Sequence, residues 1–331
     1  MQRHARVTGP IDVQTHWLPP AVLEAMEGRT EWPRFVEGNG TRFVEYGEGA
    51  RYPLTREVVD LDLKLEQMDT VGVGMSVLSI NIPGLDLFDP ADAASIAREV
   101  NDQLAEAVAA HPDRLRALAA LPMPAPEAAV GELERAMGLG LSGAILYSNV
   151  GGRSLDAPEF RQVFEAAARL DAALLLHPTY PLSAQSLNVH ALIPVIGFLF
   201  DTATATMRLI LDGLYDRHPD IKLILGHVGS VLPYIVGRLD YESSRIPGGL
   251  GALDTMPSEH IKRLYVDTVS VWPPAMQLVI DYLGADRVLY ATDHPYWDPA
   301  KTNEALAQLD LSDDEREAIE TGNAKRLLRI D

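Results

Sequence analysis

The sequence predicts an α/β protein whose strands and helices form a (β/α)8 barrel. Short apolar runs alternate with longer helical patterns along the whole chain, which is typical of βα units on a parallel sheet. About eight such units can be counted, and eight is the number that closes a barrel. With 331 residues, 47% of them hydrophobic, the chain can form one large core, so we expect a single domain over residues 1–331.

Eight runs are expected to form the strands, because each is short, apolar and bounded by turn residues. They are residues 11–16, 73–80, 115–121, 143–147, 173–177, 221–227, 264–267 and 287–292. Helical patterns lie between them at residues 61–68, 91–110, 126–139, 159–170 and 204–215.

Two segments interrupt the alternation, one at about residues 17–60 and one at residues 180–200. The first is a long insertion rich in glycine and proline after the first strand, and the second follows the fifth strand. Loops after the strands of such a barrel lie over the catalytic face, so we expect both segments there. The aromatic side chains Phe43, Tyr46 and Tyr52 either line the pocket or pack the long insertion.

The composition limits the possible partners and ligands. Forty-seven acidic and 28 basic residues give a net charge of −19, which repels nucleic acids and anionic membrane surfaces. Cysteine is absent, so a metal has to be bound by nitrogen and oxygen atoms. The first seven residues lack an apolar leader, and no uninterrupted apolar run reaches the length of a membrane span. We therefore expect a cytoplasmic protein.

Four of the predicted strands end in residues that can bind a metal, namely His16, His177, His227 and Asp293. Strand ends of a parallel barrel meet at one opening, so these side chains are expected to share a pocket. A single histidine at a strand end is usually structural, but three with an aspartate indicate a catalytic metal site. Zinc is the expected ion and manganese the alternative. His111, His218 and His260 lie in predicted helix-end turns and are expected at the surface.

These residues resemble the amidohydrolase superfamily, and within it the group around aminocarboxymuconate-semialdehyde decarboxylase and the metal-dependent aromatic-acid decarboxylases. The resemblance extends over nearly the whole chain and includes residues 65–69, 120–123, 226–229, 237–239 and 322–324. It implies that His16, His177 and Asp293 are metal ligands. It also implies that His227 acts as the general base.

The chain departs from the family pattern at two places. The family has an H-x-H pair on the first strand, and here Gln14 occupies the first position of that pair. An amide oxygen is a weaker ligand for zinc than imidazole, so Gln14 is either a metal ligand or a sign that tight metal binding has been lost. The family usually reads T-D-Y-P-F around its aspartate, and this chain has His294 and Tyr296 where that motif has Tyr and Phe.

Two arginines match family residues that hold a substrate carboxylate, for which the planar guanidinium is suited. Arg238 corresponds to an arginine that reaches the active site of the neighbouring subunit, which implies a homodimer. Arg56 lies near the position of the second. Both together indicate a small carboxylic acid substrate. Alternatively, Arg238 pairs with Asp240 or Glu242 on its own helix.

Three functions remain open from the sequence. The first is a metal-dependent, non-oxidative decarboxylase of an aromatic or enol-type carboxylic acid, in which Asp293 or His227 delivers a proton. The second uses the same site, with His227 as base, to hydrolyse a lactone, amide or thioester or to hydrate a double bond. The third, motivated by Gln14, is a catalytically silent partner of an active homologue. The barrel fold supports all three.

Overall fold

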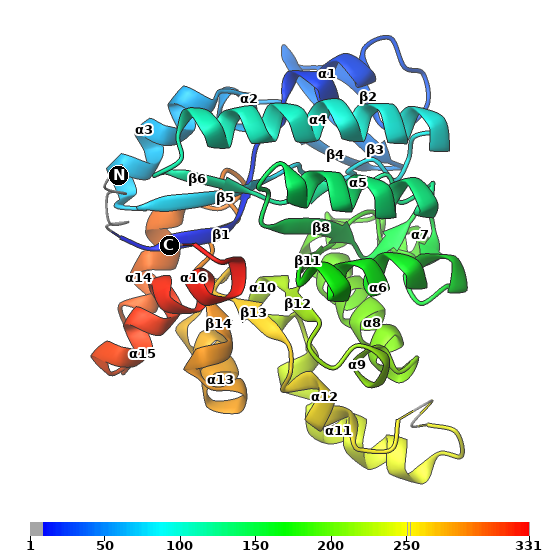
Figure 1. Cartoon of the computed structure of the whole chain (residues 1–331), viewed down its shortest axis with the longest axis vertical. Coiled ribbons are helices and arrows are strands. Elements are labelled where there is room, and N and C mark those ends of the chain that lie inside the picture. Colours follow the sequence, from blue (N-terminus) through cyan, green and yellow to red (C-terminus); the bar gives the residue numbers. More distant parts are fainter. Residues whose placement is uncertain (1–8, 250, 252, 331) are drawn as a thin grey trace.

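The computed structural model describes residues 9–249, 251 and 253–330. An eight-stranded parallel barrel forms its centre, and helices cover the outside of the barrel (Figure 1). The prediction of an α/β barrel is thus confirmed. The first seven residues, considered above for a leader, lie outside the described part of the chain, and the single domain over residues 1–331 stays a prediction.

Two parallel sheets make up the barrel wall, with strand orders β1-β5-β6 and β14-β13-β12-β11-β8-β7. One break in the third strand separates β6 from β7, so the two sheets are continuous there. The barrel closes between its first and last strands, where Val13 N donates to Tyr290 O at 3.0 Å and Thr15 forms a parallel bridge with His294. The barrel strands are β1 (Ile11–His16), β5 (Met75–Ser79), β6 (Leu115–Ala117), β7 (Ala119–Ala120), β8 (Gly143–Tyr147), β11 (Ala173–His177), β12 (Lys222–Leu225), β13 (Tyr265–Asp267) and β14 (Val288–Leu289).

The strand residues are apolar because both faces of the sheet are covered. Every residue of β5, β8 and β11 is buried, as expected for a parallel sheet with side chains packed inside and helices outside. The predicted strands 221–227 and 287–292 are longer than the observed ones. Residues 290–292 are buried but bond to β1 and to other segments instead of a continuous ladder, so burial alone did not mark the end of β14.

The outer helices begin and end where the sequence gives the appropriate residues. Proline occupies the first turn of α4, α5, α13 and α14, where its missing N–H costs no hydrogen bond. In α4 the buried residues Ala93, Ala97, Val100, Leu104 and Ala107 recur at helical spacing. The helix bounds are α1 (Pro20–Met26), α2 (Arg56–Val59), α3 (Leu61–Val71), α4 (Pro90–Ala110), α5 (Pro126–Gly138), α6 (Arg161–Leu170), α7 (Ala184–Leu187), α8 (Phe198–Leu211), α9 (Leu214–Arg217), α10 (Gly226–Gly229), α11 (Leu232–Arg245), α12 (Pro257–Ile261), α13 (Pro273–Leu283), α14 (Pro299–Leu306), α15 (Asp313–Glu317) and α16 (Asn323–Leu328).

Shorter turns complete the chain. Two are 3₁₀ turns, η1 (Pro158–Phe160) and η3 (Ala285–Arg287), and two are π turns, η2 (Ile193–Gly197) and η4 (Ala318–Gly322). A short antiparallel pair, β9 (Asn149–Val150) and β10 (Arg153–Ser154), follows β8. The apolar segment Ile193–Leu211, which runs through η2 and α8, has the length and composition of a membrane span, but 56% of it is buried in the protein. A core helix passes the same test, so this is weak support for a membrane span.

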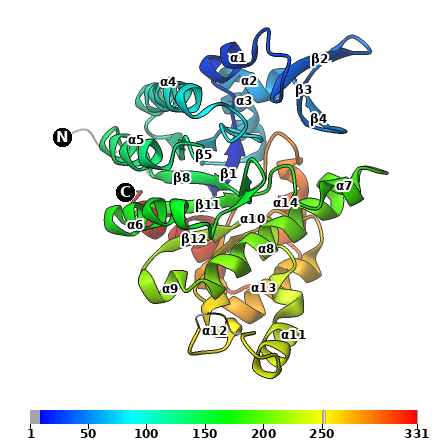
Figure 2. The ribbon, with the colours of Figure 1, turned by 90° about the vertical axis from the view of Figure 1, so that its right-hand side faces the viewer.

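The insertion after β1 contains a separate antiparallel sheet of β2 (Arg34–Gly38), β3 (Thr41–Gly47) and β4 (Ala50–Pro53). This sheet and α11 extend from opposite ends of the molecule in both views (Figures 1 and 2). The insertion thus adds a layer to the barrel instead of a long irregular loop. One surface prediction was wrong: His260 is buried, because short helix α12 packs against α11 and places it beside Tyr215.

Candidate metal centre

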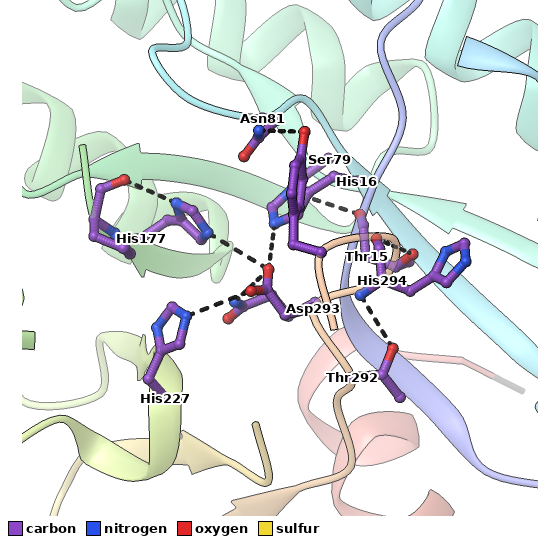
Figure 3. A network of polar contacts seen from close by, with 12 residues as sticks. Thr15, His16, Ser79, Asn81, His177, His227, Thr292, Asp293 and His294 are labelled. Carbon is purple, nitrogen blue, oxygen red and sulfur yellow. Dashed lines mark hydrogen bonds and ion pairs between the residues drawn. The ribbon is translucent and has the colours of Figure 1, made fainter. Parts of the chain in front are cut away.

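Three of the predicted ligands meet at one point of the barrel. The ligand atoms of His16, His177 and Asp293 all lie within 4.8 Å of one another, and all three residues are buried. His16 Nε2 lies 3.0 Å and His177 Nε2 lies 3.9 Å from Asp293 Oδ1. Figure 3 shows the imidazoles directed at the carboxylate from separate strands.

The backbone positions these side chains in two ways. His16 and His177 are the last residues of β1 and β11, as the sequence predicted. Asp293 lies beyond the end of β14 with φ at 59°, a left-handed conformation that non-glycine residues rarely adopt. Hydrogen bonding from Asp293 N to Gln14 O, at 2.9 Å, holds it against the first strand. Strained backbone of this kind is concentrated at functional sites.

The two histidines are oriented for metal binding by their other ring nitrogens. His177 Nδ1 lies 2.8 Å from Pro178 O, to which it donates, and this leaves Nε2 as an acceptor. That Nε2 atom is buried without a hydrogen-bond partner among the described residues. Burial lowers the pKa of His177 to about 4, so the ring is neutral at neutral pH. The orphaned lone pair and the mixed nitrogen and oxygen donors fit a divalent cation.

His227 approaches Asp293 from the other side. Its Nε2 lies 3.6 Å from Asp293 Oδ2, whereas both ligand histidines face Oδ1. His227 and Val228 have positive φ values of 58° and 49°, and His227 lies two residues beyond the end of β12. Burial would lower the pKa of His227, but the contact with Asp293 outweighs it and the net shift is upward. Burial likewise opposes ionisation of Asp293, but the three imidazoles hold its pKa well below the usual range.

Gln14 also lies at the centre, where its Nε2 donates to Asp293 Oδ1 at 3.3 Å.

The two predicted substrate arginines lie away from the metal centre. Arg56 is 72% exposed and its Nε pairs with Asp60 Oδ2 at 2.7 Å, so the structure does not bring it to the metal centre. Arg238 is exposed on α11, outside the cluster. In the described part of the chain neither Asp240 nor Glu242 pairs with Arg238: Asp240 accepts from Ser258 N and Glu242 pairs with Arg245.

Two supporting residues, Ser79 and Asp267, were not predicted from the sequence. Ser79 Oγ lies 3.2 Å from His16 Nδ1 and fixes that ring. Asp267 Oδ1 accepts hydrogen bonds from Val228 N and Val269 N, both at 3.0 Å, and so supports the loop that carries His227. Ser79 and Asp267 end β5 and β13, so the same strand-end pattern that marked His16 and His177 could have indicated them.

A row of aromatic rings leads from the metal centre to the insertion sheet. Tyr296 lies 5.9 Å from His16 between ring centroids, and Tyr52 lies 5.4 Å from Tyr296. The row continues through Tyr46, 6.0 Å from Tyr52, to Tyr180, 6.5 Å from Tyr46. Tyr46 and Tyr52 therefore pack the insertion and at the same time connect it with the site. Phe43 packs instead against the guanidinium of Arg51.

Comparison with known proteins agrees with this geometry. The model of the amidohydrolase family matches residues 11–330, nearly the whole chain. The chain belongs to the amidohydrolase family. The predicted family and barrel are thereby confirmed.

Among relatives of this amidohydrolase, the gamma-resorcylate decarboxylase of Rhizobium sp. (strain MTP-10005) is 30% identical, over 98% of this chain and 99% of its own. The structure of 5-carboxyvanillate decarboxylase from Sphingomonas paucimobilis matches with a TM-score of 0.88 and 29% identity, covering 97% of this chain and 99% of that one. A dihydroxybenzoic acid decarboxylase from Polaromonas sp. JS666, with bound manganese and the inhibitor 2-nitroresorcinol, matches with a TM-score of 0.81 and 29% identity, covering 97% of each chain.

Proposed function

We propose that this amidohydrolase is a metal-dependent, non-oxidative decarboxylase of an aromatic carboxylic acid. The observation that carries the proposal is the buried group of His16, His177 and Asp293, with the free Nε2 of His177 directed into it. Full-length relatives with aromatic-acid decarboxylase activity support the reaction. Names such as gamma-resorcylate and dihydroxybenzoic acid favour a substrate with a hydroxyl group next to its carboxylate.

The metal would be held by His16, His177, Asp293 and Gln14. When bound, it would supply a fixed positive charge for the substrate carboxylate and its neighbouring oxygen. Two of these four residues offer oxygen atoms, and oxygen ligands suit manganese. The Polaromonas relative contains manganese. We therefore favour manganese over zinc, the ion that the sequence led us to expect.

Proton delivery is assigned to the pair formed by His227 and Asp293. Oδ1 of Asp293 faces the ligand histidines, whereas Oδ2 faces His227, so the second oxygen is available for proton exchange with the imidazole. The pair would add a proton to the ring carbon that bears the carboxylate. The bond from that carbon to the carboxylate then breaks, its electrons return to the ring, and carbon dioxide leaves. A positioned acid of this kind contributes about 10²–10⁴ in rate.

The row of aromatic residues is proposed to form one wall of the substrate pocket. Tyr296 and Tyr52 extend from the metal centre in edge or tilted contacts, and a substrate ring can join such contacts. Asn81 Nδ2 donates to Tyr296 Oη at 2.5 Å and fixes the ring nearest to His16. A small aromatic acid is therefore the expected partner, and nucleic acids and membranes are not.

We propose further that the protein is a homodimer in which Arg238 contacts the substrate of the neighbouring subunit. Arg238 lies between Tyr234 and Tyr241 on α11, and these two side chains are 84% and 62% exposed. Large exposed apolar side chains in such a group are typical of a protein interface. Among the described residues no ion pair occupies Arg238. Arg56 would have to leave Asp60 before it could contact a substrate, and its predicted role stays a proposal.

Carbon dioxide release from a panel of hydroxybenzoates, measured on manganese-loaded protein, tests the function. The expected result is release that requires metal and a hydroxyl group ortho to the carboxylate. Proton release from lactones without carbon dioxide from any acid would establish the hydrolase alternative. A chain that takes up neither manganese nor zinc would favour the silent-partner alternative.

A further inference from the structure

Two buried oxygen atoms beside the metal centre, Gln14 Oε1 and Asp267 Oδ2, have no hydrogen-bond partner among the described residues. They are neighbours across Gly226: a Cβ atom on that glycine would lie 2.7 Å from Gln14 Oε1 and 3.4 Å from Asp267 Oδ2. A buried acceptor without a partner costs about 1–3 kcal/mol, so two such atoms around one point need an explanation.

The opposite end of each side chain is engaged. Gln14 Nε2 donates to Asp293 Oδ1, and Asp267 Oδ1 accepts from two backbone amides. Neither side chain can therefore move away without losing a contact. A half-turn of the Gln14 carboxamide, however, exchanges its oxygen and nitrogen while the rest of the side chain stays in place.

We propose that Asp267 orients Gln14 as an oxygen ligand of the metal. In the turned carboxamide, Nε2 faces Asp267 Oδ2 and supplies the donor that this oxygen lacks. Oε1 would then face Asp293, and both oxygens would be available to the cation that His16 and His177 would hold. This inference rests on the proposed metal-dependent function and assigns a positioning role to a residue two strands away from Gln14.

Gly226 makes the arrangement possible. Any side chain at this position would press on the Gln14 carboxamide, since its first carbon would already lie 2.7 Å from Oε1. Space beside the Gln14 carboxamide, and not an unusual backbone conformation, is what favours glycine here. Asp267 thus serves both sides of the centre, because one oxygen holds the loop of His227 and the other lies with Gln14 Oε1 around Gly226.

The chemistry explains why a glutamine needs such a partner. A carboxamide can present either an acceptor or a donor to the ion, and only the acceptor binds. A carboxylate that accepts from Nε2 selects the correct orientation and increases the negative charge on Oε1. Residues that orient a metal ligand in this way typically change metal affinity about 10–100-fold.

The test is a double-mutant cycle on manganese affinity, measured by competition with a chelator. Asp267→Asn keeps an oxygen for Val228 N and Val269 N but presents an NH₂ group to Gln14, which favours the wrong carboxamide orientation. We expect about 10–100-fold weaker manganese binding in this variant. In the Gln14→Glu background the same substitution should not weaken binding, because the introduced carboxylate presents an oxygen atom at both of its ends.

A second pair of variants covers the case in which Asp267→Asn does not fold. Gly226→Ala should weaken manganese binding in the wild-type background and have no effect in the Gln14→Ala background. A manganese-bound crystal structure should show the oxygen of Gln14 on the ion and its nitrogen toward Asp267. Equal effects of Asp267→Asn in both backgrounds would overturn the orientation role alone, whereas a wild-type chain without manganese affinity would overturn the metal-dependent function as well.

Discussion

Lys64 Nζ lies 2.8 Å from His294 Nδ1, although Lys64 belongs to the outer helix α3 and His294 follows the last barrel strand. The same amine donates to Thr15 Oγ1 at 2.8 Å, and the Lys64 side chain is almost completely buried. Thr15 precedes the ligand His16, and His294 follows the ligand Asp293. One amine therefore connects the two chain segments that carry ligands on either side of the barrel closure.

Replacement of Lys64 by methionine should destabilise this closure. Methionine fills a similar volume but leaves His294 Nδ1 without its donor, at a cost of about 1–3 kcal/mol. Urea unfolding should show this loss, and manganese affinity should fall as well. Lys262→Met, at a surface lysine paired with Glu259, is the control and should behave like the wild type. Unchanged stability and affinity in Lys64→Met would mean that the amine does not position the ligands.

His227→Ala should retain the metal and lose most turnover. His227 faces Asp293 Oδ2 and not the ligand side of the carboxylate, so its removal leaves His16, His177 and Asp293 in place. We expect kcat to fall about 10²–10⁴-fold with bound manganese unchanged by elemental analysis. His218→Ala, in the turn before β12, is the matched control. Loss of manganese from His227→Ala would instead identify His227 as a ligand.

Arg238→Ala should impair catalysis without preventing dimer formation. If Arg238 reaches the neighbouring substrate, a mixture with the metal-site variant Asp293→Ala should regain activity. Some sites in the mixed dimers then combine an intact arginine from one chain with an intact metal centre from the other. Activity after mixing and the mass of the assembly are the measurements. If the subunits exchange but activity is not recovered, Arg238 does not contact the substrate of the neighbouring subunit.

His260 should make the folded protein sensitive to acid. Burial lowers the pKa of His260 below its usual 6.5, and its Nε2 lies 2.8 Å from Thr255 Oγ1. The unfolded chain therefore binds a proton more readily, and stability is lost as the pH falls through 6.5. The free energy of unfolding, measured at about pH 7.5 and about pH 5.5, on either side of the usual histidine pKa, should decrease more for the wild type than for His260→Gln. Equal decreases would show that His260 does not contribute.

The sequence was most informative where a side chain ends a regular strand. His16 and His177 were found because β1 and β11 are continuous runs of buried residues that stop at these histidines. His227 and Asp293 also lie at the cluster, but both lie beyond their strands with positive φ. Apolar residues before Asp293 are buried whether or not they belong to a ladder, so the pattern could not reveal this conformation.

Contacts between distant segments could not be predicted in the same way. The positioning of His16 by Ser79 and the burial of Lys64 depend on how strands and helices pack, and neither leaves a local pattern. The substrate role of Arg56 stays a prediction from family resemblance. The structure adds a contact that this prediction did not include, the pair with the Asp60 carboxylate four residues along the chain.

The barrel closure has a consequence for the order in which the protein can mature. His16 ends the first strand of the barrel and Asp293 follows the last, and they come within 3.0 Å of each other only when β1 and the segment after β14 are adjacent. During synthesis the chain therefore cannot assemble the cluster until the segment after β14 has left the ribosome. Acquisition of metal would then report completion of the fold, and a chain cut short before Asp293 would keep the first two histidines without the carboxylate that joins them.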